Sequence, residues 1–129
     1  MDPVESALET PPVLIVADDL IWSSRLRAAV ERAGTTSVVS SSVGQLATAL
    51  AIWPAGSPVI VDLNGRAYEG IDAVRAASEA GHRVLAVGQH EDLELRRRAL
   101  AAGARRVFSY NKLFSDGPAV VTSLLEGKL

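Results

Sequence analysis

Acidic side chains follow two apolar segments of this chain, at the point where each segment ends. Asp18 and Asp19 come directly after an all-apolar run at 13–17. Asp62 comes directly after Val-Ile-Val at 59–61. In open α/β sheets, functional groups gather in the crevice at the carboxyl ends of the strands. A carboxylate at the point where a buried strand reaches solvent is therefore well placed for chemistry, and Asp62 is the leading candidate.

The segments that would position these acids alternate between strand and helix signals. Apolar runs rich in β-branched residues predict strands, and apolar residues spaced three to four apart, closed by glycines, predict helices. The predicted strands lie at 13–17, 37–40, 59–61, 84–88 and 107–109, each followed by a helix, and the last helix is predicted to begin at Pro118. Such alternation produces right-handed βαβ crossovers. The sequence therefore predicts an α/β fold, a doubly wound five-stranded parallel sheet with helices on both faces.

The composition fits one globular domain. The 129 residues are 48% hydrophobic and 22% charged, with no cysteine and a formal net charge of −2. The absence of cysteine removes disulfides, thiolate nucleophiles and thiolate metal sites. The negative charge argues against general nucleic-acid or membrane-surface binding, and no apolar stretch is long enough to span a bilayer. We expect a cytoplasmic protein with a flexible N-terminal lead-in at 1–12 and a single domain at 13–129.

Several motifs share the spacing of response-regulator receiver domains, the signalling modules of bacterial two-component systems. Val16-Ala17-Asp18-Asp19 resembles the family's acidic motif after the first strand, and Asp62 stands where the family has its phosphoacceptor aspartate. Glu69-Gly70 resembles the family's Asp-Gly, and Gly103-Ala104 its Gly-Ala before the last strand. The resemblance covers 13–125. It implies a flavodoxin-like fold with the strand order 2-1-3-4-5.

The resemblance also implies chemistry at the acidic end of the sheet. Asp62 falls on the nucleophile that becomes an acyl phosphate in the family. Asp18 falls on a metal-binding aspartate, and Asn64 on the position whose backbone carbonyl completes the metal site. Two carboxylates that face each other favour a cation between them, and Mg²⁺ suits carboxylates, a carbonyl and water. We expect a Mg²⁺ site of Asp18, Asp62 and the Asn64 carbonyl, weakened because Ala17 replaces the family's other aspartate.

Two switch positions depart from the family. Gly88 stands in place of the Thr or Ser after the fourth strand, and it has no hydroxyl to bond a phosphoryl oxygen. Tyr110 stands in place of the lysine after the fifth strand, and a neutral phenol cannot make the charge-assisted contact of an ammonium group. Lys112 is a candidate substitute cation, with an exposed surface lysine as the favoured alternative. We expect the usual readout of phosphorylation to be lost.

These features predict an atypical stand-alone receiver that acts by protein–protein interaction. In the leading version, Asp62 accepts phosphate from a histidine kinase in a phosphorelay. In the alternative version, a pseudo-receiver docks constitutively on another signalling protein without phosphorylation. A homodimer is a further candidate assembly, and neither nucleic acid nor membrane is an expected partner.

Two enzyme or ligand-binding classes fit the residues less well. A Mg²⁺-dependent phosphatase of the haloacid-dehalogenase type needs a second acid where Asn64 stands. A nucleotide- or flavin-binding module needs glycines and free amides in the first strand–helix loop, which here contains Asp18-Asp19. We expect no enzyme activity.

Three other features have competing interpretations. The run Arg96–Arg98 suggests a DNA-binding patch, but i,i+4 pairing of Asp92 with the first of these arginines and Glu94 with the last predicts local charge compensation. Trp22 lies on the apolar stripe of its helix and is expected to pack against the core. His82 is expected at the surface.

Overall fold

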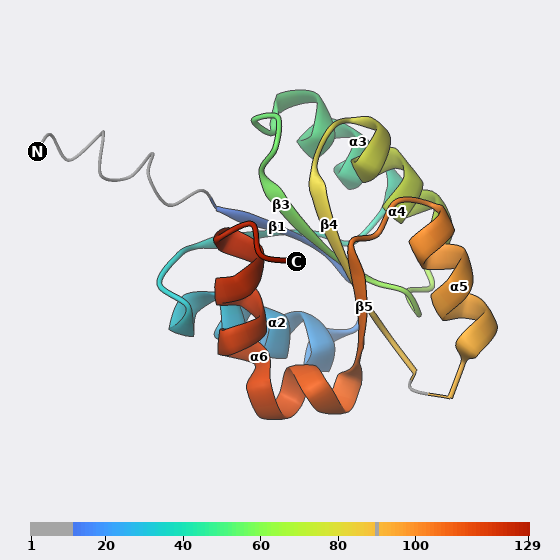
Figure 1. Ribbon diagram of the computed structural model, residues 1–129. Coiled ribbons are helices and arrows are strands. Elements are labelled where there is room, and N and C mark those ends of the chain that lie inside the picture. The colour runs from blue at the N-terminus through green and yellow to red at the C-terminus, as the bar shows by residue number, and fades with distance from the viewer. Residues whose placement is uncertain (1–11, 90) are drawn as a thin grey trace, which may run out of the picture.

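The computed structural model describes residues 12–89 and 91–129, so the predicted lead-in lies outside the described residues except for Pro12. The described residues form five strands and five helices in alternation (Figure 1). The strands are β1 (Val13–Val16), β2 (Ser37–Ser40), β3 (Pro58–Asp62), β4 (Arg83–Gly88) and β5 (Arg106–Ser109). The helices are α2 (Leu20–Arg32), α3 (Val43–Ile52), α4 (Gly70–Glu79), α5 (Leu93–Ala101) and α6 (Tyr110–Leu125). No helix of the described part has the length and apolarity needed to cross a bilayer.

The strands form one parallel sheet in the order β2-β1-β3-β4-β5, which confirms the predicted fold class and strand order. Every residue of β1 and β3 is buried, as expected for strands covered on both faces. Val16 pairs with Val61, and Asp62 pairs with Val87. The acids that follow β1 therefore reach the same edge of the sheet as Asp62.

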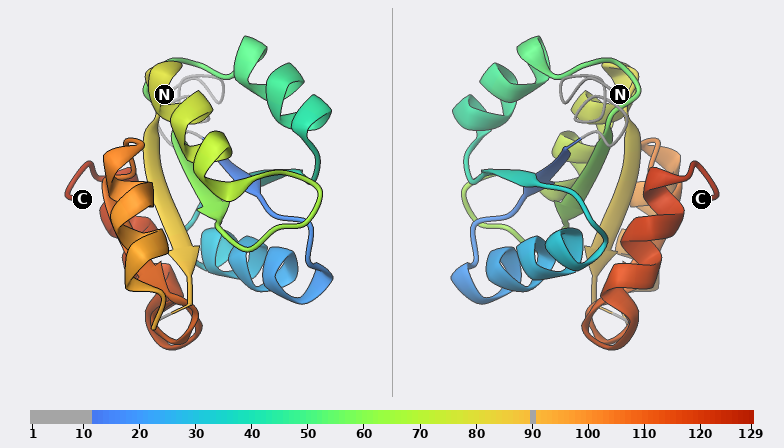
Figure 2. Two further views of the ribbon diagram at one scale, coloured as in Figure 1. Left: turned by 90° about the vertical axis from the view of Figure 1, so that its right-hand side faces the viewer. Right: turned by 90° about the vertical axis from the view of Figure 1, so that its left-hand side faces the viewer.

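The helices cover the two faces of the sheet in two separate layers (Figure 2). Side chains from α2 and α6, including Leu26 and Leu124, share one apolar cluster with residues of the central strands. Side chains from α3, α4 and α5, including Leu46 and Val74, share the other cluster. This division is the doubly wound arrangement, and it leaves the carboxyl ends of the strands uncovered by helices.

Polar side chains fix the helix starts that lie at the carboxyl end of the sheet. Asp19 caps α2 by accepting a hydrogen bond from the Trp22 N–H at 2.8 Å. Glu69 caps α4 by accepting from the Asp72 N–H at 2.6 Å. Such caps satisfy backbone donors that have no partner inside the helix. Asp19, the second acid after β1, is therefore a helix cap.

The last helix starts earlier than predicted, at Tyr110 instead of Pro118. The Ser109 hydroxyl caps it by accepting from the Lys112 N–H at 3.1 Å. The helix is kinked at Asp116, whose φ of −126° and ψ of 23° are non-helical. Pro118 follows the kink, where its missing N–H costs little. The prediction identified the second segment of α6 and missed the first, which places Tyr110 on a helix and not in a loop.

Two other expectations are wrong. His82 is buried, with 6% of its surface exposed, and its Nδ1 has no hydrogen-bond partner within the described chain. Asp92 is the cap of α5 and accepts from the Leu95 N–H at 3.0 Å. Glu94 pairs with Arg97 at 2.6 Å, so the arginine run is compensated at i,i+3 and not in the i,i+4 pattern predicted.

Candidate functional site

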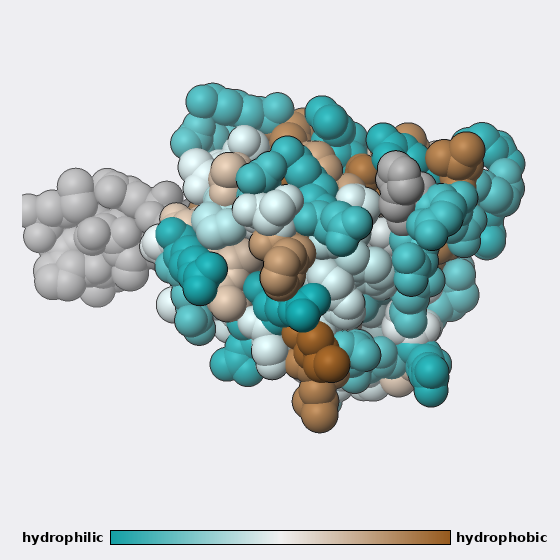
Figure 3. Space-filling model, turned by 90° about the horizontal axis from the view of Figure 1, so that it is seen from below, coloured by the Kyte–Doolittle hydropathy of each residue, from teal (hydrophilic) through white to brown (hydrophobic). Residues whose placement is uncertain are grey.

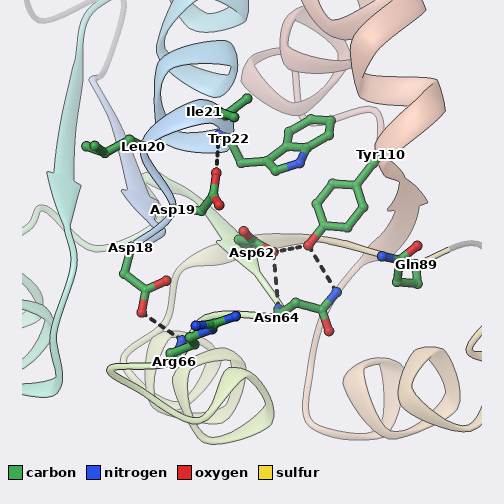
Figure 4. Close-up of a pocket in the computed structure, with 10 residues that line it drawn as sticks. All are labelled: Asp18, Asp19, Leu20, Ile21, Trp22, Asp62, Asn64, Arg66, Gln89 and Tyr110. Carbon is green, nitrogen blue, oxygen red and sulfur yellow. Dashed lines mark hydrogen bonds between the residues drawn. The ribbon is translucent and has the colours of Figure 1, made fainter.

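A cavity of about 780 Å³ opens at the carboxyl end of the sheet (Figure 4). Five parts of the chain meet there: the start of α2, the end of β3, the loop before α4, the residue after β4 and the start of α6. The cavity is lined by Asp18, Asp19, Leu20, Ile21, Trp22, Asp62, Asn64, Arg66, Gln89 and Tyr110. The fold thus brings together the predicted acids, the Asn64 position and Tyr110.

Asp62 is the buried centre of this cavity, with 2% of its surface exposed. Its Oδ1 accepts a hydrogen bond from the Tyr110 hydroxyl and another from the Asn64 N–H at 3.1 Å. Burial raises the pKa of Asp62, the charges of Asp19 and Asp18 add to this, and the two hydrogen bonds oppose it. No partner of Oδ2 is found in the described part of the chain. One carboxylate oxygen is therefore engaged and the other faces the cavity.

Tyr110 connects this carboxylate to the aromatic side of the cavity. Its hydroxyl accepts a hydrogen bond from Asn64 Nδ2 at 3.0 Å while it donates to Asp62. The Trp22 and Tyr110 ring centroids are 4.3 Å apart with planes inclined at 35°. Burial, followed by the bond to the Asp62 carboxylate, raises the pKa of Tyr110, so the phenol stays neutral. Trp22 packs beside the α2–α6 core, as predicted, and also lines the cavity.

Asp18 holds the loop between β3 and α4. Its Oδ2 accepts hydrogen bonds from the Arg66 N–H at 2.7 Å and the Ala67 N–H at 2.6 Å. Figure 4 shows its carboxylate pointing toward Arg66. The Asp18 carboxylate, predicted as a metal ligand, thus has one oxygen occupied by backbone amides.

The described part of the chain offers few side-chain ligands for a metal ion at this cavity. Within residues 12–89 and 91–129, no group of three or more His, Cys, Asp or Glu side chains is placed to hold one ion. The donors available for a divalent cation are the free carboxylate oxygens of Asp62 and Asp18 and the predicted Asn64 carbonyl. This donor set suits a hard ion that retains several waters, with fewer protein ligands than a dedicated site.

Tyr68 is a site residue that the sequence analysis did not identify. Its buried hydroxyl lies 2.6 Å from the Asp62 carbonyl oxygen and 3.0 Å from the Val16 carbonyl oxygen. It therefore ties the end of β1 to the end of β3 directly below the carboxylates. A Cβ on Gly65 would lie 2.2 Å from the Tyr68 ring, so glycine is needed for this approach. A lone tyrosine in a predicted loop belongs to no periodic pattern, so no sequence signal could have identified it.

Gly88, an altered switch position, and Lys112, the candidate substitute cation, each have other contacts in the structure. A Cβ on Gly88 would lie 3.2 Å from Leu63 Cδ1, so a larger residue there would require this leucine to shift. Lys112 pairs with Asp116 at 2.8 Å and lines a different cavity, with Arg106 and Phe108 among its neighbours. Lys112 is therefore an exposed surface lysine, as in the favoured alternative.

Hydrophobic side chains are exposed beside the cavity. Leu20, Ile21 and Phe114 expose 83%, 63% and 67% of their surfaces. The Arg25 guanidinium lies 5.0 Å from the Trp22 ring centroid and 4.8 Å from that of Phe114, so it joins α2 to α6. Figure 3 views the molecule from the side where β4 and β5 end. It shows a protruding group of hydrophobic residues surrounded by mostly hydrophilic ones.

Comparisons with known proteins support the fold through similarity to solved structures, and not through similarity of sequence. The chain matches no family model and no curated protein. Among solved structures, it is similar to a CheY-like receiver domain protein of Methanospirillum hungatei, with a TM-score of 0.78 and 18% identity over 92% of this chain and 96% of that one. A receiver protein of Burkholderia phymatum gives a TM-score of 0.74 and 24% identity over 90% and 95%.

A third similar structure was solved in a modified state. A response regulator of Burkholderia pseudomallei, determined with a phosphorylated aspartic acid, a calcium ion and citrate, gives a TM-score of 0.72 and 16% identity, covering 89% of this chain and 66% of that one. All three identities are below 25%. They establish that this chain has the fold of response-regulator receiver domains.

Proposed function

We propose that this chain is a receiver-type signalling module that acts by binding another signalling protein, without requiring phosphorylation of Asp62. The observation that carries the proposal is the closed hydrogen-bond network of Tyr110, Asp62 and Asn64. The group at the lysine position already bonds the candidate acceptor, and it does so as a neutral phenol. A phosphoryl group on Asp62 would find no ammonium there to pair with its added charge.

Two further observations support a site that does not respond to phosphorylation of Asp62. Asp18 has one oxygen committed to the Arg66 and Ala67 amides, and Ala17 contributes no carboxylate, so metal affinity is reduced. Gly88 has no hydroxyl group that could move inward and hydrogen-bond a phosphoryl oxygen. Output through protein contact is supported by the exposed side chains of Leu20, Ile21 and Phe114, because apolar groups gathered on a surface mark interaction sites.

The second candidate is the phosphorelay version, in which Asp62 accepts phosphate from a histidine kinase. It is favoured by the free Oδ2 of Asp62, which lies in an open cavity. In that reaction Oδ2 attacks phosphorus and forms the new P–O bond, and the bond to the donor breaks with its electron pair leaving on the donor group. Mg²⁺ held by Asp18, Asp62 and the Asn64 carbonyl would offset the phosphoryl charge.

Intact mass and amide NMR spectra with a phosphodonor separate the two versions. The wild type, Asp62→Asn and the double variant Tyr110→Lys, Gly88→Thr are each treated with Mg²⁺ and acetyl phosphate, and then with beryllofluoride. We expect no phosphoryl adduct and no shifts around Asp62 in the wild type. The double variant reports whether restoring an ammonium and a hydroxyl restores a response.

The outcomes are distinct. An adduct on the wild type that is absent from Asp62→Asn would overturn the proposal in favour of the phosphorelay version. An adduct only on the double variant would support it and would identify the two substituted positions as the cause of the lost response.

A further inference from the structure

We propose that the edge strand β2 is a self-association surface, at which two copies of this chain pair antiparallel across a two-fold axis at Val38. The proposal does not depend on the chemistry of Asp62, so it goes beyond the proposed function. Three features of the region around β2 support it: its lack of charge, the outward groups of its backbone and the apolar side chains beside it.

The segment that contains β2 and α3 carries no charged residue. No Lys, Arg, Asp, Glu or His lies between Arg32 and Asp62, although 22% of the whole chain is charged. Among the five helices of the described part, α3 is the one without a charged residue. At a two-fold interface, a charge near the axis faces its own copy and is repelled, so a neutral surface suits self-association.

The two edges of the sheet differ in their charge. Charged residues on an edge strand oppose pairing with another chain. β5 begins at the exposed Arg106, which follows the exposed Arg105, and the Arg106 guanidinium lies 5.3 Å from the Phe108 ring centroid. β2, the other edge, has the sequence Ser-Val-Val-Ser and an unbroken register with β1. The right-hand view of Figure 2 shows this edge on the near side of the molecule, between α2 and α3.

The backbone of β2 presents a self-complementary set of donors and acceptors. The carbonyls of Thr36 and Ser40 accept hydrogen bonds on the β1 side, at 2.9 Å and 3.1 Å. Since alternate residues of a strand face the same neighbour, Val38 also faces β1, and the N–H and C=O groups of Ser37 and Val39 face outward. In an antiparallel pair centred on Val38, Ser37 of each copy bonds Val39 of the other through both groups. This is the closely spaced pair of bonds of an antiparallel ladder.

Exposed apolar side chains lie on one face of the same edge. Val38 pairs in register with Leu14, whose side chain belongs to the cluster under α3, α4 and α5, so Val38 lies on the α3 face of the sheet. Val43 lines a groove toward α4, and Ile52, nine positions later at about 100° per residue, lies on the opposite side of α3. Val38 exposes 48% of its surface and Ile52 76%. Both side chains therefore lie on the β2 side of this face, where a second copy would cover them.

A second copy of this chain fits the edge better than other occupants. A charged peptide or a nucleic acid would find no opposite charge between Arg32 and Asp62. A lipid surface would desolvate the outward N–H and C=O groups of Ser37 and Val39 without giving them partners. A copy of β2 supplies both the partners and an apolar counterpart for Val38. The contact involves one short strand and one side of a helix, so we expect a weak, concentration-dependent dimer.

Sedimentation velocity on the full chain, from about 5 to about 500 µM, tests the proposal. We expect a monomer at the lower concentrations and a dimer at the higher ones. Val38→Lys places two ammonium groups opposite each other at the axis and should weaken the dimer at least about tenfold. Ser37→Pro removes an outward N–H and no bond to β1, so it should weaken the dimer and leave the sheet intact. Circular dichroism confirms that each variant is folded.

Leu100→Lys is the matched control. Leu100 is 43% exposed, close to the value for Val38, and lies on α5, which packs beside β5 at the opposite edge of the sheet. This variant should leave the dimer unchanged.

A mixture of Val38→Lys and Val38→Glu tests the two-fold axis itself. In the mixed dimer the ammonium group of one copy faces the carboxylate of the other, whereas each variant alone places like charges opposite each other. We expect each variant alone to be monomeric and the mixture to recover the dimer.

A chain that stays monomeric over the whole concentration range would overturn the proposal. So would a dimer that Val38→Lys and Ser37→Pro leave unchanged, or one that Leu100→Lys weakens equally, which would indicate general association of exposed apolar groups. A mixture that stays monomeric would place the contact away from Val38 and would also overturn it. None of these measurements uses a phosphodonor, so their outcome is separate from the test of the proposed function.

Discussion

The Tyr110 hydroxyl donates a hydrogen bond to Oδ1 of Asp62, across 48 positions of sequence. This contact joins the first residue of α6 to the last residue of β3. A donor at the lysine position therefore still reaches the candidate acceptor, but it brings no positive charge. The substitution at 110 retains a hydrogen bond and loses an ion pair, which is the main physical difference between this site and the family pattern it resembles.

Tyr110→Phe should lower the free energy of unfolding by about 1–2 kcal/mol, because it removes a donor from a buried carboxylate and an acceptor from Asn64. It should also raise the pKa of Asp62, since the hydrogen bond favours the charged form. Urea denaturation and carboxyl ¹³C titration measure the two effects. Phenylalanine keeps the ring beside Trp22, so an unchanged Asp62 titration would contradict the assigned role of the hydroxyl.

Asp62 should make the stability of the protein fall as pH rises through its raised pKa. The folded state binds this proton more tightly than the unfolded state, whose carboxyl titrates near 3.8. The favourable contribution is therefore complete below 3.8 and is lost as pH rises through the folded-state value. Asp62→Asn cannot titrate, so urea denaturation at a series of pH values should show the wild type losing stability relative to the variant. A difference that stays constant over this range would refute the prediction.

Gly70→Ala should destabilise the protein by about 2 kcal/mol or more, as expected for overpacking against rigid backbone. The added Cβ would lie 2.5 Å from the carbonyl oxygen of Leu63, the residue that follows Asp62. This backbone atom cannot move without disturbing the chain next to Asp62. Gly44→Ala in α3 is the control, since nothing lies within 4 Å of the added Cβ. It should stabilise the protein by about 0.5–1 kcal/mol through helix propensity. Thermal unfolding of both variants checks the contrast, and similar effects in both would contradict it.

Asp18→Ala should release the loop between β3 and α4. The Arg66 and Ala67 amides would lose their carboxylate acceptor, and we expect a stability loss of about 1 kcal/mol because the site is partly exposed. Hydrogen exchange at these two amides should accelerate, while exchange in the strands follows global stability. Glu31→Ala removes an acid from the exposed face of α2 and should leave both amides unchanged. Unaltered exchange in Asp18→Ala would show that the loop is held by other contacts.

The sequence by itself determined the architecture of this protein. Runs such as 13–17 and 59–61 are apolar and mostly β-branched, a local pattern that predicts buried parallel strands without knowledge of their neighbours. The acids placed at the ends of these runs had to reach one edge of the sheet, because parallel strands end on the same side. Asp19 as a helix cap is also a local matter, since cap and amide are three residues apart.

Only the tertiary structure decided how the side chains at that edge are partnered. Asp18 bonds amides 48 and 49 positions away, and Tyr68 bonds the carbonyl of a residue 52 positions away. The partner of Tyr110 was likewise decided by the fold. The sequence showed that this residue carries no charge, but only the tertiary structure placed its hydroxyl in hydrogen-bonding contact with Asp62. Such partners depend on crossover packing and loop conformation, for which no local pattern exists. The positions of the acids were therefore predictable, and their hydrogen bonds were not.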